Sequence, residues 1–322
     1  MTLIGHEDAW REWRAAVASE RMHHAWILAG ARGLGKGTFA RAAAAALVDE
    51  PGTSQPEAAS HPDIHVLDHL PANDDEEAKK ADGKPYQTKR NITIDQIRGV
   101  QRRLVTRPTL GSRRAIVIDA ADDLEKNAVN ALLKSLEEPP VGTFFLLIAH
   151  RPGRLLPTVR SRCRMLRFAP LEAEAIDSIL RREAPEADAA ARAAAIAAGE
   201  GSPGAALQFV GHGLGTLHAL MQRIVREGDA DFALRGLLAA EVGARPDRAR
   251  QLATLDLARA TLAGDLAAAP RERQARIIEA HAAVVTLAAQ APTYNFDPGL
   301  LVMEIGGLLA SAATPRRAAA PI

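Results

Sequence analysis

The stretch AWILAGARGLGKG, residues 25–37, joins a short apolar run to a glycine-rich turn that ends in a lysine. The turn matches the phosphate-binding pattern G-x-x-x-x-G-K through Gly30, Gly35 and Lys36, and Gly33 lies inside it. The apolar run predicts a buried strand, and the residues after the turn predict a helix. In this order, backbone N–H groups, a helix N-terminus and a lysine surround phosphate oxygens. The stretch therefore predicts an α/β domain with a phosphate-binding loop.

Other strand and helix patterns alternate around this stretch. Between residues 68 and 90 the chain is polar and charged, which predicts an exposed loop. From about residue 171 onward only helical patterns occur, separated by Gly and Pro. The expected helices of the first half are at residues 7–20, 36–48, 94–104 and 127–136, and the expected strands are at 25–29, 115–118 and 143–149.

These patterns predict an α/β domain with a parallel sheet, followed by an all-α part. A chain of 322 residues is long enough for two or three domains. We expect an α/β domain at residues 1–168, a small helical lid at 169–211 and a C-terminal helical domain at 212–322. The division of the helical part follows the Gly- and Pro-containing segment 199–204.

Composition restricts the classes of function. The net charge is +1, so no overall positive field draws the chain to nucleic acid. No apolar run approaches the roughly 18 residues of a membrane span, and Glu7 and Asp8 stand where a signal peptide would be basic. The single cysteine, Cys163, excludes an internal disulfide and any zinc site built from several cysteines. We expect a cytoplasmic protein without a membrane partner.

The sequence departs from an active ATPase at two positions. The residue after the P-loop lysine binds Mg²⁺ through a hydroxyl group, but here it is Gly37; Thr38 points roughly 100° away along a helix. Asp119 ends a predicted strand, where a second acidic residue is needed, but Ala120 follows it. Without a base to orient water, hydrolysis would be slow. A simple glycine turn, and a local capping role for Asp119, are the alternatives.

Four further segments carry a resemblance to a known family. In order and spacing they closely resemble the clamp-loader ATPase family of AAA+ proteins, over roughly residues 5–210. Such proteins have a RecA-type P-loop domain, a helical lid and a helical collar, so the resemblance implies this fold. The segments are His61-Pro62-Asp63, Ile94-Asp95-Gln96-Ile97-Arg98, residues 130–140 (NALLKSLEEPP) and residues 156–163 (LPTVRSRC).

Within that family the chain looks most like the δ′ type of bacterial DNA polymerase III, because its own ATP machinery is degraded while Ser161-Arg162-Cys163 is intact. The resemblance implies that Arg162 is an arginine finger, which acts on the ATP of a neighbouring subunit. A guanidinium is always charged and suits a transferring phosphoryl group. An ordinary surface ion pair of Arg162 is the alternative. The implied partners are the γ/τ and δ subunits and, through the assembly, the sliding clamp and primer–template DNA.

Further departures point the same way. Ala149-His150-Arg151 stands where the family's ATPases carry a polar sensor residue, and Ala205 stands where they carry a lid arginine. The zinc-binding cysteines of many relatives are missing. We therefore expect no ATPase activity of the isolated chain, no required cofactor and no metal site, and weak binding of ATP or ADP stays open. Two other hypotheses remain: a self-sufficient γ/τ-type clamp-loader ATPase, and a stand-alone P-loop scaffold protein.

Overall fold

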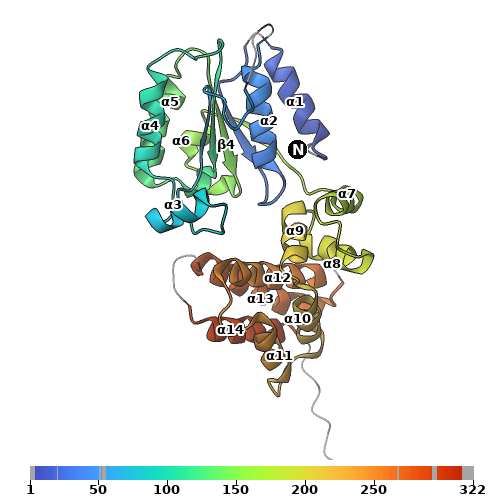
Figure 1. Cartoon of the computed structure of the whole chain (residues 1–322). Helices are drawn as coiled ribbons and strands as arrows, with labels where there is room; N and C mark the ends of the chain where they lie inside the picture. The colour runs from blue at the N-terminus through green and yellow to red at the C-terminus, as the bar shows by residue number, and fades with distance from the viewer. Residues whose placement is uncertain are drawn as a thin grey trace, which may run out of the picture. The chain divides into compact units, whose positions relative to one another are not determined.

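The structure, a computed structural model, describes residues 4–19, 21–50, 52, 56–266, 268–291 and 296–313. The chain divides into two compact units, residues 1–171 and residues 172–322. The first unit contains a sheet with helices, and the second contains helices only within its described residues (Figure 1). The predicted combination of an α/β part and an all-α part is confirmed.

The first unit is built on a five-stranded sheet in the order β2-β3-β4-β1-β5. Every strand pair in it is parallel. Parallel strands buried under helices have short continuous apolar sequences, which is why β1, β3 and β4 could be recognised in the sequence. The strands are β1 (Ala25–Ala29), β2 (Ile64–Leu67), β3 (Arg114–Asp119), β4 (Thr143–Ala149) and β5 (Arg164–Arg167).

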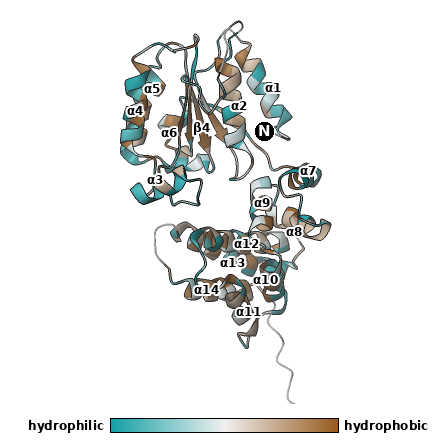
Figure 2. Cartoon of the chain, in the orientation of Figure 1, coloured by the Kyte–Doolittle hydropathy of each residue, from teal (hydrophilic) through white to brown (hydrophobic). Residues whose placement is uncertain are grey.

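Helices cover both faces of this sheet. One apolar cluster joins the sheet to α1 and α2, and a second joins it to α4, α5 and α6. In Figure 2 the strands are mostly brown, whereas α3 is largely teal. The helices are α1 (Glu7–Val17), α2 (Lys36–Val48), α3 (Asp74–Ala81), α4 (Ile94–Leu104), α5 (Lys126–Glu137) and α6 (Pro157–Arg160), with short 3₁₀ turns at Ala121–Asp123 and Pro152–Arg154.

The sequence prediction was wrong between residues 68 and 90. This segment holds the helix α3, not only a loop. The Asn73 side chain accepts a hydrogen bond from Glu76 N–H, four acidic residues occupy the first turn, and Lys79 and Lys80 lie in the last turn. A cap and charges that complement the helix dipole favour a helix even where few apolar residues are available.

The second unit contains eight helices among its described residues. The first three, α7, α8 and α9, contact one another, and α12 and α13 form the most extensive helix pair. The predicted division of the helical part between residues 211 and 212 remains a prediction. Residues 314–322 of the predicted C-terminal domain lie outside the described residues. The helices are α7 (Ala173–Glu183), α8 (Ala189–Gly199), α9 (Pro203–Gly211), α10 (Gly215–Glu227), α11 (Ala233–Val242), α12 (Arg248–Leu266), α13 (Arg271–Gln290) and α14 (Pro298–Ser311).

Across the described part of both units, no helix combines the length and the apolar character that a membrane crossing requires.

Candidate nucleotide site and surface arginine

The glycine-rich loop lies between the end of β1 and the start of α2. Gly33 and Gly35 adopt φ angles of 80° and 81°, a left-handed conformation that residues with a Cβ atom rarely adopt. A Cβ atom on Gly30 would lie 2.6 Å from the carbonyl oxygen of Phe168, so this position tolerates no side chain. The three glycines of the motif are therefore required by the path of the backbone.

Lys36 is turned into this loop. Its side chain is almost fully buried, and its Nζ donates hydrogen bonds to the carbonyl oxygens of Gly30 at 2.8 Å and Ala31 at 2.6 Å. Burial lowers the pKa of Lys36 to about 8, while the nearby carboxylates of Asp119 and Asp122 oppose that change. The ammonium group of Lys36 is thus hydrogen-bonded to carbonyl groups of the loop itself.

Asp119 is brought to the same edge of the sheet. It ends β3, in register with Ile148 of the neighbouring β4. Burial raises the pKa of Asp119, and the positive charges of Arg41 and Lys36 oppose this rise. A Cβ atom on Gly37 would lie 3.0 Å from Asp119 Oδ2, so the first residues of α2 and the end of β3 meet here. Thr38 is half-buried one position further along α2.

His150 also lies at this edge, directly after β4. Its backbone N–H donates to the Asp122 carboxylate, and its buried Nδ1 has no hydrogen-bond partner among the described residues. Burial and the charge of Lys36 lower the pKa of His150 to about 4. The imidazole is therefore neutral near pH 7 and adds no positive charge to the loop.

Arg162 lies elsewhere in the unit. It precedes β5, whose first residue Arg164 pairs with Trp26 near the start of β1. The P-loop follows the C-terminal end of β1, so Arg162 and the P-loop lie at opposite ends of the sheet's strands. Trp26 and Ala29, the first and last β1 residues paired with β5, are about 10 Å apart at 3.3 Å per residue. Arg162 is therefore not part of the nucleotide site of its own chain.

The Arg162 guanidinium is held at the surface by an ion pair with Glu137 and by hydrogen bonds to the Thr158 carbonyl oxygen and, at 3.4 Å, to Ser161 Oγ. Its Nη2 lies 2.7 Å from Glu137 Oε1, and its Nη1 donates to the carbonyl oxygen of Thr158 at 2.9 Å. The side chains of Arg162 and Glu137 are 34% and 50% exposed. The two residues belong to two of the four segments that carry the family resemblance, but the sequence alone did not reveal that they touch.

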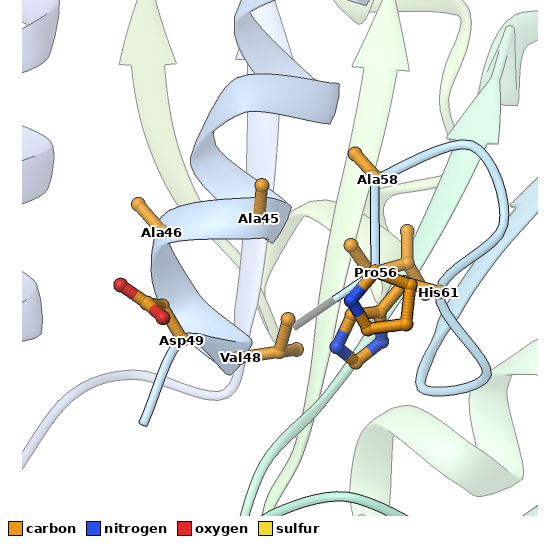
Figure 3. A pocket seen from close by; sticks show the side chains of 8 residues that line it. Ala45, Ala46, Val48, Asp49, Pro56, Ala58 and His61 are labelled. Atoms are coloured by element: carbon orange, nitrogen blue, oxygen red, sulfur yellow. The ribbon is translucent and has the colours of Figure 1, made fainter. Parts of the chain in front are cut away.

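Cys163 is not a nucleophile, and a pocket on α2 is separate from the P-loop. Burial raises the pKa of the Cys163 thiol to about 12, so the residue is a neutral thiol and not a nucleophilic thiolate near pH 7. A cavity of about 230 Å³ is lined by Ala45, Val48, Pro56 and His61, among others (Figure 3). It lies at the C-terminal end of α2, whereas Lys36 lies at the N-terminal end, so it is separate from the P-loop.

Comparisons with known proteins agree with this architecture. DNA polymerase III subunit delta′ of Pseudomonas aeruginosa is 34% identical over 219 residues, which cover 63% of this chain and 62% of that protein. The subunit of the same name from Escherichia coli K12 is 32% identical over 204 residues, which cover 60% and 56%. The chain thus matches less than two thirds of the length of either relative.

A solved structure shows the same fold. The crystal structure of a DNA polymerase III gamma subunit-related protein from Thermotoga maritima superposes with a TM-score of 0.51 at 18% identity and covers 94% of this chain and 98% of that one. The predicted fold, a parallel-sheet domain followed by helices, is thus confirmed. A family model described as DNA polymerase III, delta subunit, matches residues 5–172, which is more than half of the chain. This chain therefore belongs to the DNA polymerase III delta subunit family, and the two bacterial relatives described above are delta′ subunits.

Proposed function

We propose that this chain is a δ′-type subunit of the DNA polymerase III clamp loader, which hydrolyses no ATP itself and donates Arg162 to the ATP of a neighbouring subunit. In this role it acts in the cytoplasm with γ/τ and δ subunits and reaches the sliding clamp and primer–template DNA through that assembly. Its relatives are named as subunits of DNA polymerase III, which supports these partners.

The observation that carries the proposal is the position of Arg162. This arginine lies at the sheet edge opposite its own P-loop, near the surface of its unit. An arginine that serves a nucleotide must place its guanidinium against the phosphoryl oxygens. Arg162 can do so only for a nucleotide held by another chain.

The chain's own nucleotide site supports the same conclusion. Gly37 supplies no hydroxyl group for Mg²⁺, and Ala120 follows Asp119 where a water-orienting carboxylate is needed. The Lys36 ammonium is already paired with loop carbonyl groups. Positioning of water and of Mg²⁺ is much of what a protein contributes to phosphoryl transfer, and this site lacks the hydroxyl group and the carboxylate that would supply them.

The contact with Glu137 does not prevent Arg162 from acting in trans. Partly exposed ion pairs contribute about 0–1 kcal/mol. A bidentate pairing of a guanidinium with phosphate oxygens is stronger than an exposed pair. Exchange of Glu137 for a phosphate group of a partner's ATP is thus favourable. The ion pair that was the alternative interpretation of Arg162 is therefore compatible with the finger.

The test is ATP hydrolysis by a reconstituted clamp loader in the presence of primed DNA and clamp. We expect Arg162→Ala to lower turnover at the one site that it serves by about 10³-fold or more, so the total rate falls by that site's share. Arg162→Lys should behave similarly, because a lysine cannot form the planar fork. The matched control is Arg160→Ala, which removes an exposed arginine two residues away.

Assembly must be measured alongside hydrolysis. Size-exclusion chromatography should show that the Arg162→Ala loader keeps its subunits. An unchanged hydrolysis rate in an intact assembly would refute the finger. The isolated chain should hydrolyse no ATP above a buffer blank; DNA-stimulated turnover by it would instead favour the self-sufficient γ/τ-type ATPase. Failure to assemble with γ/τ and δ would favour the stand-alone scaffold.

A further inference from the structure

Arg41 lies next to the position where a P-loop protein holds its metal ion. It stands four residues after Gly37 on α2, and this spacing places the two residues on one face of the helix. A Cβ atom on Gly37 would lie 3.0 Å from Asp119 Oδ2 and 3.1 Å from Arg41 Nη1. The space beside Gly37 is therefore lined by a carboxylate oxygen and a guanidinium nitrogen.

The residues around this space do not fit Mg²⁺. The ion needs near-octahedral oxygen ligands, and P-loop proteins provide them from a Ser or Thr hydroxyl group, phosphates and water. Gly37 has no hydroxyl group, and within the described part of the chain Asp119 is the acidic side chain closest to this space. Among the described residues, no group of three or more His, Cys, Asp and Glu side chains is arranged to hold a metal ion. A guanidinium at the same place also repels a divalent cation.

The positive charge of Arg41 favours the ionised form of Asp119, as a bound cation would. Burial raises the pKa of this carboxyl group, and Arg41 makes the largest contribution that opposes the rise, ahead of Lys36. Arg41 occupies an exposed position of α2. Its guanidinium is thus available to Asp119 and to anions that approach the loop.

We propose that Arg41 takes the place of the divalent cation at this P-loop, so that the loop's affinity for nucleotide does not depend on Mg²⁺. The inference deepens the proposed function and rests on it, because it gives a physical reason why this subunit does not hydrolyse ATP. Gly37 belongs to the same arrangement, since a Ser or Thr side chain there would press against both Asp119 and Arg41. The two positions together exclude the metal.

The experiment compares four proteins: wild type, Gly37→Thr, Arg41→Ala and the double variant. A fluorescent ADP analogue is titrated into each isolated full-length chain with excess Mg²⁺ and again with EDTA. The wild type should show the same affinity in both buffers to within about two-fold, whether that affinity is weak or below detection. The double variant should bind the analogue about ten-fold more tightly with Mg²⁺, which corresponds to about 1.4 kcal/mol.

Two controls make the result specific. Asp119→Asn in the double variant should abolish the gain with Mg²⁺, and Arg98→Gln, which removes an exposed arginine from α4, should leave the wild-type behaviour unchanged. Thermal unfolding of each variant confirms that it is folded. A wild type that binds more tightly with Mg²⁺, or a folded double variant indifferent to Mg²⁺, overturns the inference. This assay uses the isolated chain and does not involve Arg162, so its failure is distinct from failure of the finger in the assembled loader.

Discussion

Under the proposed function, the ion pair between Arg162 and Glu137 must open before the arginine can reach a partner's phosphate. Since both side chains are substantially exposed, we expect Glu137→Ala to change the free energy of unfolding by less than about 1 kcal/mol. Urea denaturation followed by circular dichroism measures this change. The variant should also keep full hydrolysis in the assembled loader. A loss above about 2 kcal/mol would show that the pair is structural and that Arg162 is not free to act in trans.

The half-buried imidazole of His150 gives a second prediction. Its folded-state pKa is about 4, below the ordinary value of 6.5, so folding favours the neutral ring. The stability that the neutral ring contributes is fully present above pH 6.5 and is lost as the pH falls toward 4. A tenfold difference in proton affinity between the folded and unfolded states corresponds to about 1.4 kcal/mol. A change of the pKa from 6.5 to about 4 exceeds tenfold, but solvent screening of the partly exposed ring reduces its contribution to stability.

The measurement is urea denaturation at pH 7 and at pH 5 for wild type and His150→Gln. We expect the wild type to lose about 1 kcal/mol more than the variant between these two pH values. All other titrating groups are common to both proteins, so the difference isolates His150. Equal losses would mean that the ring is exposed to water in both protonation states.

The sequence predicted the residues of the candidate site that belong to local motifs. Gly30, Gly33, Gly35 and Lys36 could be identified because the phosphate-binding pattern is contiguous and its backbone geometry demands glycine. Arg41 and Glu137 could not. Their roles depend on which strand end or loop lies opposite them, and a single sequence carries no signal for such a contact.

At the scale of elements, the central strands and the long helices were predictable and the edge strands were not. β1 and β4 are continuous apolar runs because helices cover both their faces, and both were predicted with their observed bounds. β2 and β5 lie at the two edges of the sheet, are four residues long and carry His65 and two arginines. Edge strands tolerate polar residues, so they leave no apolar run in the sequence.

The His61-Pro62-Asp63 segment fixes the loop between α4 and β3. Asp63 is buried and accepts hydrogen bonds from the backbone N–H groups of Thr109 at 2.7 Å and Leu110 at 2.8 Å. Its Oδ1 also lies 3.8 Å from Nε of the buried Arg114. One carboxylate thus satisfies two backbone donors and faces a buried positive charge.

Asp63→Ala should therefore lower the free energy of unfolding by about 3–5 kcal/mol, because it leaves Arg114 buried without its carboxylate. Chemical denaturation followed by tryptophan fluorescence measures this loss. The matched control is Asp95→Ala, whose carboxylate pairs with Arg98 at 3.7 Å on the surface of α4. The control should cost less than about 1 kcal/mol. Similar losses for both variants would show that Asp63 is not a buried anchor.

At the scale of the whole molecule, the sheet of the first unit keeps Arg162 apart from the P-loop. The carboxyl ends of its strands bring together the P-loop, Asp119 and His150, and Arg162 lies at the amino ends. A parallel sheet makes this separation unavoidable, because all its strands end at the same edge. Under the proposed function, the chemistry of the chain's own site can therefore be lost without changing the scaffold that presents Arg162.

The division of the chain into two compact units predicts that a lesion in the helical unit leaves the sheet unit folded. Asp229 is buried in the second unit, and its Oδ2 accepts a hydrogen bond from Arg235 Nε at 2.7 Å. Burial alone would raise the pKa of Asp229, but the hydrogen bonds from Arg235 and the backbone outweigh it and lower the pKa. Asp229→Ala should destabilise the second unit by about 3–5 kcal/mol, because it leaves a largely buried guanidinium unpaired.

The chain offers a built-in way to see which unit unfolds. Its three tryptophans, Trp10, Trp13 and Trp26, all lie in the first unit, whereas helices of both units contribute to circular dichroism. In a urea titration of Asp229→Ala, part of the dichroism should disappear at lower urea than in the wild type while the fluorescence midpoint stays unchanged. A fluorescence transition that shifts together with the dichroism would show that the two units unfold as one cooperative body, and then a lesion among the helices would also remove the sheet edge that presents Arg162.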